Sequence, residues 1–247
     1  MDGNVTSRRV AVAALMGGAV ILLKGCGPSI EDRVEFNYRL TVEVETPQGT
    51  STGSSVIWVR AVRTPDWVNP EGRGNRAKFK GEAVAVDLPN GKTLFVLLQT
   101  ESGASDAADY PILAFNNELQ GSADMVDGYQ WLSTSQGQSA QMPRTELVLP
   151  NGGTEVSAWP LLVMFEDIAD PTSIKRVDPD NLTASFGVGY RLKSISVTIA
   201  DEPITNRIIN RLGWLFDKNR KKFDPDRKPE GIPLGDFTRL FSTEKST

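Results

Sequence analysis

The feature that most restricts the fold is a strict alternation of apolar and polar side chains between residues 35 and 45. A period of two places every second side chain on the same face of a β-strand, so that one face is buried and the other meets water. A turn sequence follows at 46–49, and residues 54–62 then form a second run rich in β-branched side chains. The two runs predict an antiparallel hairpin.

A second hairpin is predicted between residues 81–88 and 92–99. The turn between them contains Asn90-Gly91, and this pair is a strong hairpin signal because both residues tolerate positive φ angles. Residues 94–98 are apolar at every position, so this strand should be covered on both faces and lie inside its sheet.

The remaining elements are predicted from shorter patterns. Strands are expected at 146–149, 161–165 and 192–199, and a short helix at 178–185 that stops before Gly187. A longer helix is expected from Pro203 onward. Its apolar stripe would consist of Ile204, Ile208, Leu212 and Leu215.

The chain shows no internal repeat and no linker. Residues 34–241 are therefore expected to form a single α+β domain with a mainly antiparallel β-sheet built from hairpins. A few helices accompany the sheet, the longest near the C-terminus. Residues 242–247 are expected to form a disordered tail.

An apolar run of 14 residues, Val10–Leu23, stands near the N-terminus and follows Arg8 and Arg9. A helix needs roughly 20 apolar residues to cross a bilayer, so this run is too short to span one well. Cations before a short apolar run are typical of a secretory signal peptide. We interpret this part of the chain as a removable leader.

The run ends at Leu23-Lys24-Gly25-Cys26, which contains the single cysteine of the chain. This tetrapeptide resembles the lipobox of bacterial lipoproteins, although Lys24 stands where that pattern prefers a small or hydroxyl residue. The resemblance implies that residues 1–25 are a lipoprotein-type signal peptide and that Cys26 becomes the lipidated first residue. Residues 26–33 would then be a tether.

The same resemblance carries expectations about location. A lipidated Cys26 would attach the domain to a membrane of the bacterial cell envelope, facing the periplasm. Gly27 follows the cysteine, where Asp is the usual signal for retention in the inner membrane, so sorting to the outer membrane is implied. The mature domain resembles the uncharacterised envelope lipoproteins of Gram-negative bacteria, a group that implies no particular chemistry.

A different interpretation of the N-terminus remains open. Apolar runs of 10 to 14 residues are often buried helices, so the chain could be a cytosolic domain whose apolar N-terminus arises by chance.

Composition excludes several functions. The chain has no histidine, which rules out Ser-His-Asp and Cys-His nucleophiles and histidine-containing zinc sites. The formal net charge is −4, and an acidic domain is poorly suited to binding nucleic acid, which depends on neutralising phosphates. We expect no nucleic-acid partner, no cofactor and no metal.

Residues 166–180 are rich in carboxylates and allow one enzymatic alternative. Two acidic side chains held a few ångström apart could hydrolyse an envelope glycan. The segment lacks the spacing of a calcium loop, however, and its Asp-Pro pairs are ordinary turn formers. We interpret these carboxylates as turn and capping groups and assign no catalytic residue.

Two segments have the composition of contact surfaces. The loop at 64–80 carries Trp67, Arg73 and Arg76, and the Ser/Gln-rich segment at 121–143 carries Tyr129 and Trp131. Aromatic rings beside amide and hydroxyl groups suit contact with a protein or a glycan. The alternative, which we favour, is that these aromatic rings pack back onto the sheet and anchor their loops.

A basic run at 207–223 also allows two interpretations. It could lie against anionic headgroups, or it could be a helix that packs on the core, and we favour the core. The function that we expect is a lipid-anchored envelope protein with a binding or scaffold role, whose partner is an envelope protein or a glycan.

Overall fold

The fold was analysed in a computed structural model of the chain. The chain divides into two compact units, Met1–Ile30 and Glu31–Thr247, and every described residue lies in the second unit. The described residues are 33–63, 76–116, 118–119, 125–148, 154–220, 222–223, 229–233 and 237–243. Cys26, Trp67 and Arg73 therefore lie outside the described residues.

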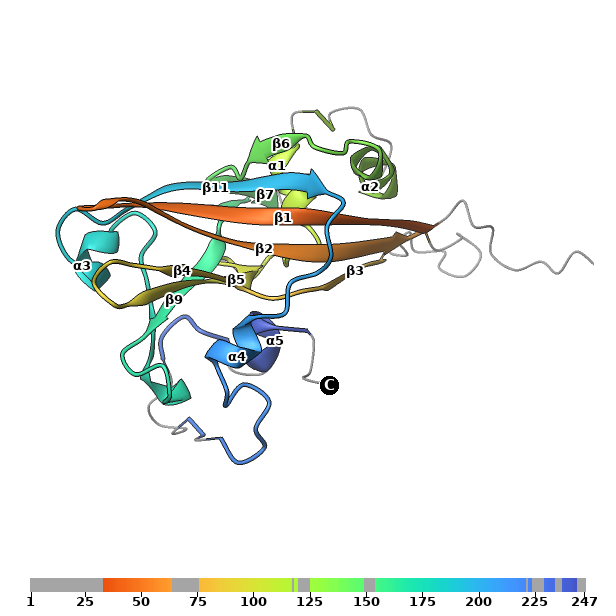
Figure 1. Cartoon of the computed structure of the whole chain (residues 1–247). Coiled ribbons are helices and arrows are strands. Elements are labelled where there is room, and N and C mark those ends of the chain that lie inside the picture. The colour runs from red at the N-terminus through yellow and green to blue at the C-terminus, as the bar shows by residue number, and fades with distance from the viewer. Residues whose placement is uncertain are drawn as a thin grey trace, which may run out of the picture. The chain divides into compact units, whose positions relative to one another are not determined.

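The first sheet has five antiparallel strands in the order β3-β2-β1-β11-β6 (Figure 1). Its two longest strands pair along their whole length from Arg33↔Val62 to Thr46↔Gly49, which confirms the hairpin predicted from the alternation. The strands of this sheet are β1 (Arg33–Thr46), β2 (Gly49–Val62), β3 (Arg76–Lys80), β6 (Ser139–Gln141) and β11 (Arg191–Ala200).

The second sheet has four antiparallel strands in the order β10-β9-β5-β4. The predicted hairpin around Asn90-Gly91 is confirmed, and Gly91 adopts a φ of 79° in its turn. The strands are β4 (Val84–Asp87), β5 (Thr93–Thr100), β9 (Pro160–Phe165) and β10 (Ile174–Arg176). A separate two-stranded ribbon joins β7 (Thr145–Val148) to β8 (Thr154–Ser157).

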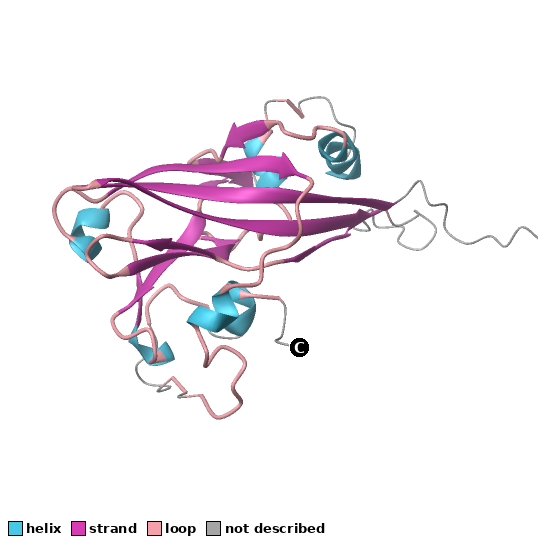
Figure 2. Ribbon diagram, viewed as in Figure 1, coloured by secondary structure: helices cyan, strands magenta, loops and turns pink. Residues whose placement is uncertain are grey.

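The main core lies between the two sheets (Figure 2). The alternating apolar side chains of β1, β2 and β11 point inward and meet one face of β4, β5 and β9. Burying each such side chain contributes about 1.5–3 kcal/mol, which explains why the alternation of β1 fixes its register. The outer face of the first sheet carries the intervening polar side chains.

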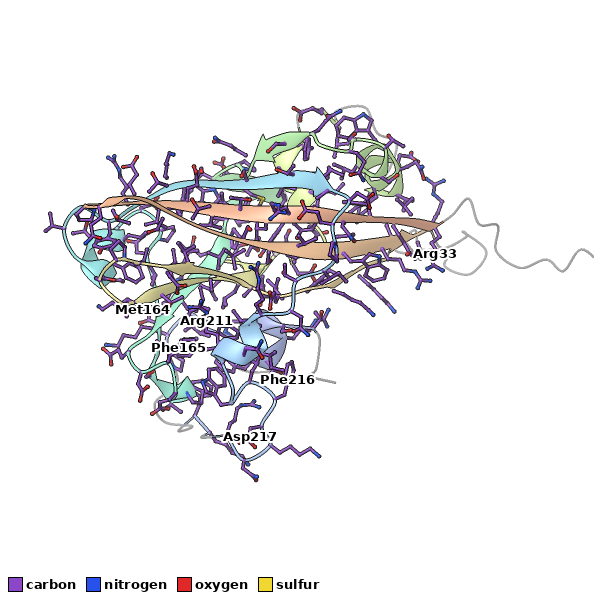
Figure 3. The ribbon with its side chains drawn as sticks, in the orientation of Figure 1. Arg33, Met164, Phe165, Arg211, Phe216 and Asp217 are labelled. Atoms are coloured by element: carbon purple, nitrogen blue, oxygen red, sulfur yellow. The ribbon has the colours of Figure 1, made fainter. Side chains whose placement is uncertain are left out.

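A second apolar cluster covers the opposite face of the second sheet. Phe95 and Leu97 of β5 point into it with Phe165 of β9, and α4 (Ile208–Arg211) and α5 (Phe237–Phe241) lie over them (Figure 3). The rings of Phe95 and Phe165 meet edge to face at 5.4 Å. Strand β5 is therefore buried on both faces, as its continuous apolar run predicted. Both clusters consist of residues between Val34 and Phe241.

The α+β fold class with mainly antiparallel strands is confirmed, but the expected position of the longest helix is wrong. Among the described helices the longest is α2 (Met125–Ser133), in the middle of the chain. The helix expected from Pro203 is the single turn α4, which ends just before Leu212 and Gly213. Ile208, Leu212 and Leu215 are nevertheless buried, which confirms the core-packing interpretation of this run.

The other helices are short. Helix α3 (Leu182–Phe186) ends at Gly187, where φ is 106°, so the predicted stop is confirmed. Helix α1 (Tyr110–Ala114) and the 3₁₀ turn at Pro171–Ser173 were not predicted.

The C-terminal boundary of the domain also differs from expectation. Ser242 is buried and forms a β-bridge with Glu82, and the backbone N–H of Thr243 donates to the carbonyl oxygen of Gly81 at 3.0 Å. These two residues were assigned to a disordered tail, so the ordered domain extends at least to Thr243.

Candidate functional site

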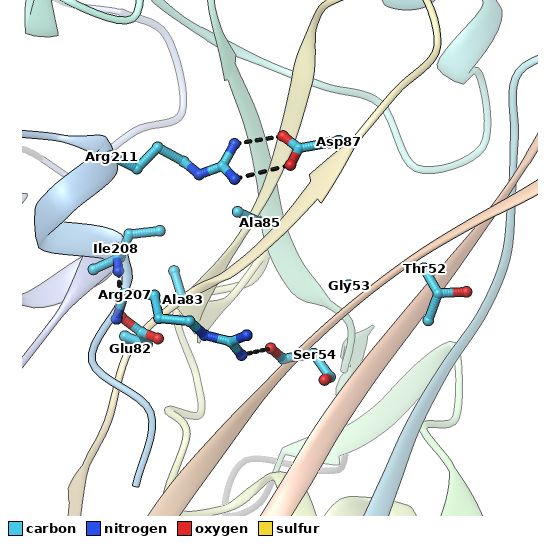
Figure 4. Close-up of a pocket in the computed structure, with 10 residues that line it drawn as sticks. All are labelled: Thr52, Gly53, Ser54, Glu82, Ala83, Ala85, Asp87, Arg207, Ile208 and Arg211. Atoms are coloured by element: carbon cyan, nitrogen blue, oxygen red, sulfur yellow. Dashed lines mark hydrogen bonds and ion pairs between the residues drawn. The ribbon is translucent and has the colours of Figure 1, made fainter.

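A polar hollow lies between the two sheets and α4. It has a volume of about 300 Å³ and is partly open to solvent, and Figure 4 shows the residues that line it. Strands β2 and β4, the segment before β4 and the first turn of α4 contribute its walls. The lining residues are Thr52, Gly53, Ser54, Glu82, Ala83, Ala85, Asp87, Arg207, Ile208 and Arg211. We call this hollow the polar groove.

The polar groove exists because β3 is shorter than its neighbour β2. Strand β3 pairs only with the last residues of β2, from Trp58 to Val62, so the earlier part of β2 is left beside β4 of the other sheet. A β-carbon at Gly53 would lie 2.4 Å from the carbonyl oxygen of Ala85. Glycine at this position therefore permits the close approach of the two sheets that forms the groove floor.

Glu82 fixes one wall of the groove. Its side chain is 3% exposed, and its Oε2 accepts the backbone N–H groups of Arg207 at 2.6 Å and Ile208 at 2.5 Å. Its carbonyl oxygen accepts the hydroxyl of Ser55 at 2.7 Å. Glu82 thus joins the start of α4, through its carboxylate, to β2, through its backbone carbonyl, and the carboxylate satisfies two backbone donors that the helix itself cannot satisfy.

Asp87 and Arg211 form the opposite wall. The guanidinium of Arg211 donates through both terminal nitrogens to the two carboxylate oxygens of Asp87, with one contact of 2.8 Å. This hydrogen bonding lowers the pKa of Asp87 and raises the pKa of Arg211. Arg207 donates to the carbonyl oxygen of Ser54 at 3.1 Å.

The chemistry of the groove follows from these pairs. Asp87 is held in its ionised form by a guanidinium, and Glu82 is committed to the backbone of α4. Glycoside hydrolysis needs one carboxylic acid that donates a proton, a role that neither group is placed to take. The hydroxyls of Thr52 and Ser54 and the guanidinium of Arg207 instead suit hydrogen bonding to a small polar ligand.

A carboxyl with a raised pKa lies in a different hollow. Burial raises the pKa of Asp106, while a hydrogen bond from the backbone N–H of Ala108 and the charge of Arg239 oppose the shift. The hollow has a volume of about 210 Å³. Its lining residues are Phe79, Leu98, Gln99, Asp106, Arg239 and Leu240.

We predict that Asp106→Asn raises the free energy of unfolding at neutral pH. The pKa of Asp106 in the folded chain lies above its ordinary value of 3.8, so the folded state keeps this proton where the unfolded state has lost it. The contribution of Asp106 to stability is therefore lost as pH rises through its folded pKa. Urea unfolding should show a higher midpoint for Asp106→Asn at neutral pH and no difference from wild type in acid. The exposed Asp201→Asn is the control, and an equal rise in that variant would contradict the assignment.

The carboxylates of the acidic segment serve the fold. Asp170 accepts the backbone N–H of Thr172 at 2.9 Å at the start of the 3₁₀ turn, and Asp178 accepts the N–H of Asp180 at 2.9 Å. Glu166 pairs with Lys175. Within the described residues, no group of three or more acidic or cysteine side chains is arranged to hold a metal ion.

Asp180 belongs to a charged network on the second sheet. Arg144 donates to Asp180 at 2.8 Å and lies over the ring of Trp159, with its guanidinium carbon 4.9 Å from the ring centroid. Arg176 and Arg144 both contact Glu101. Burial opposes ionisation of Glu101, but hydrogen bonds from Arg176 and Ser157 outweigh it and lower the pKa. The network joins β5, β10 and the start of α3.

The predicted contact residues are not brought together in one described surface. Tyr129 is fully buried in α2, where its hydroxyl donates to the carbonyl oxygen of Ala108 at 3.0 Å, so its assignment to a contact surface is wrong. Trp131 is half-buried and meets the ring of Phe115 at 5.8 Å. These rings anchor their segment, as the alternative interpretation held. Arg76 begins β3 opposite Val62, so residues 76–80 are a strand and not a loop.

The groove residues were missed by the sequence analysis. Thr52, Glu82 and Arg211 come from three distant parts of the chain, and nothing in their local patterns marks them as neighbours. The one local signal was Gly53, a glycine inside a strand, which often indicates a close approach of another backbone.

None of the described helices is both long enough and apolar enough to cross a membrane.

Comparisons with known proteins do not identify the chain. No family model matches the sequence, and no curated protein and no solved structure is detectably similar to it.

Proposed function

We propose that this chain is a bacterial lipoprotein that carries a β-sandwich domain in the cell envelope, where the domain binds or positions a partner. The lipid on Cys26 would hold it in the outer membrane, facing the periplasm. The observation that carries the proposal is the tetrapeptide Leu23-Lys24-Gly25-Cys26 at the end of a short apolar run that follows two arginines. Strand β1 begins at Arg33, seven residues after the cysteine, which leaves room for the proposed tether.

A binding role is supported by the chemistry of the polar groove. Its walls present the hydroxyl groups of Thr52 and Ser54 and the guanidinium of Arg207, whereas Asp87 and Arg211 pair with each other and Glu82 accepts from the backbone of α4. Such a lining recognises a polar or anionic group by hydrogen bonding. The partner is expected to present such groups, as envelope glycans and polar protein segments both do.

The proposal is tested by Cys26→Ser, which removes the sulfur that would receive the diacylglyceryl group. We expect the lipid-anchored form to disappear completely and the chain to persist as an uncleaved or soluble form. Fractionation of a Gram-negative host and immunoblotting of washed membranes measure the change. Ser29→Ala, three residues further on, should leave the anchored form intact.

A second variant tests the sorting. Gly27→Asp should move the anchored protein from the outer to the inner membrane when the two membranes are separated by density.

For the Cys26→Ser test, mature protein that remained in the washed membranes at the wild-type level would contradict a lipid anchor at this cysteine.

A further inference from the structure

Cations gather on the outer face of the first sheet at the end where β1 begins. The register places Glu35, Arg60 and Lys78 in one row across β1, β2 and β3, and Trp58 and Lys80 opposite each other in the next row. Their neighbours in sequence, such as Phe36, Val59 and Phe79, are buried on the inner face, so these side chains point outward.

Among its described residues this surface is positive, although the chain is acidic. Arg33, Arg60, Lys78 and Lys80 lie there with one described carboxylate, Glu35, which contacts both arginines. The side chains of Arg33 and Arg60 are 51% and 38% exposed, and both lysines are exposed. We call these four cations the basic end of the sheet. Arg76 lies at the neighbouring register position, opposite Val62.

The other end of the same face is electrically balanced. Glu43 pairs there with Lys193, and Glu45 pairs with Arg191. The basic end also holds a half-buried indole, because the Nζ of Lys80 lies 5.7 Å from the ring centroid of Trp58. Cations beside tryptophan are typical of surfaces that meet the headgroup region of a bilayer.

The basic end is also the end at which the tether joins the domain. Arg33 is the first residue of β1 and follows Cys26 by seven residues (Figure 3). Seven residues span at most about 25 Å when fully extended. A lipid on Cys26 would therefore keep these cations close to the bilayer surface.

We propose that Arg33, Arg60, Lys78 and Lys80 bind the phosphate groups of an anionic phospholipid bilayer and so hold the outer face of β1–β3 against the membrane. This inference rests on the proposed lipid anchor for its place in the cell. A lipid chain gives attachment, and a basic surface beside it fixes the orientation of the domain and leaves the groove side available to a partner.

The test uses the chain from Gly27 to Thr247, which contains both apolar clusters and carries no lipid. Sedimentation measures its binding to vesicles of phosphatidylglycerol and phosphatidylcholine, and to vesicles of phosphatidylcholine alone. We expect weak binding to the acidic vesicles only, falling as salt is raised. Each cation near such a surface strengthens binding roughly fivefold, so Lys78→Gln/Lys80→Gln should weaken it about 25-fold.

The matched control is Lys218→Gln/Lys222→Gln, which removes the same charge from exposed positions in the basic run near the C-terminus. It should bind as the wild type does, and both variants should melt with the wild type. Greater loss in the control than in the Lys78/Lys80 variant would place the lipid surface at the C-terminal run and overturn the proposal. Binding that does not depend on salt or on acidic lipid would also overturn it.

Two further outcomes are decisive. Release of the domain by inorganic phosphate, beyond the release by chloride at equal ionic strength, would indicate a phosphate site and contradict a bilayer surface. Self-association of the Lys78/Lys80 variant with unchanged vesicle binding would mean that the lysines only protect an edge strand. The chain from Gly27 to Thr247 carries no lipid, so a lack of vesicle binding would contradict the proposed basic surface but not the lipid anchor. An unmodified Cys26 in cells would contradict the lipid anchor but not the basic surface.

Discussion

Replacing Gly53 with alanine is expected to lower the free energy of unfolding by about 3 kcal/mol. The added β-carbon would lie 2.4 Å from the carbonyl oxygen of Ala85 and 3.0 Å from its carbonyl carbon. Both atoms belong to the backbone of β4, so relief of the clash requires the two sheets to separate. For a domain of this size the melting temperature should fall by about 6–12 °C, as measured by circular dichroism.

Gly213→Ala is the matched control for this effect. A β-carbon at Gly213 would meet no atom within 4 Å, so the free energy of unfolding should change by less than about 0.5 kcal/mol. Equal melting temperatures for Gly53→Ala and wild type would mean that β2 and β4 are not in close contact, and the groove floor described above would be wrong.

Replacing Glu82 with alanine is expected to cost about 3 kcal/mol of unfolding free energy. The change leaves the backbone N–H groups of Arg207 and Ile208 without the carboxylate oxygen that accepts both. Buried donors that lose a charged acceptor destabilise a fold by about 1–3 kcal/mol each. Glu82→Gln keeps an acceptor oxygen and should recover more than half of the loss in urea unfolding.

The control for Glu82 is Glu118→Ala, at an exposed position, which should unfold with the wild type. The Glu82→Ala variant should also show a local change in hydrogen exchange. Because Glu82 ties α4 to β2, hydrogen exchange of the α4 amides should accelerate in Glu82→Ala more than exchange in β1. Uniform acceleration through both elements would show that the carboxylate has no specific role at α4.

The two long hairpins were predicted correctly because their signals are local, whereas the short strands β3, β6, β8 and β10 were not predicted. The alternation between residues 35 and 45 and the turn at Asn90-Gly91 each fix a hairpin within a short stretch of chain. The apolar run at 94–98 even indicated a strand covered on both faces, and the second apolar cluster supplies the second cover.

The helices were predicted less well because their patterns are interrupted. Helix α2 buries Val126, Tyr129 and Leu132 at a helical spacing, but Gly128 and the Ser/Gln-rich surroundings suggested an irregular surface segment. Of the predicted C-terminal stripe, Ile208, Leu212 and Leu215 are buried, whereas Ile204 is half-buried and precedes the helix. Gly213 follows the first turn, so turns rather than a continuous helix carry Leu215 into the core.

The polar groove could not be predicted from the sequence. Its walls come from β2, from the segment before β4 and from α4. They meet because β3 pairs with only part of β2 and because the C-terminal part of the chain returns over the second sheet. The basic end of the sheet likewise depends on the register between β1, β2 and β3. The sequence analysis placed residues 76–80 in a loop and gave no indication of their cross-strand neighbours.

The lipid anchor on Cys26 is best tested by the intact mass of the protein extracted from Gram-negative membranes, with Cys26→Ser measured beside it. We expect a wild-type species that begins at Cys26 and is heavier than that polypeptide by the mass of attached lipid, and no such species in the variant. An unmodified chain that still carries residues 1–25, recovered from the soluble fraction, would contradict it.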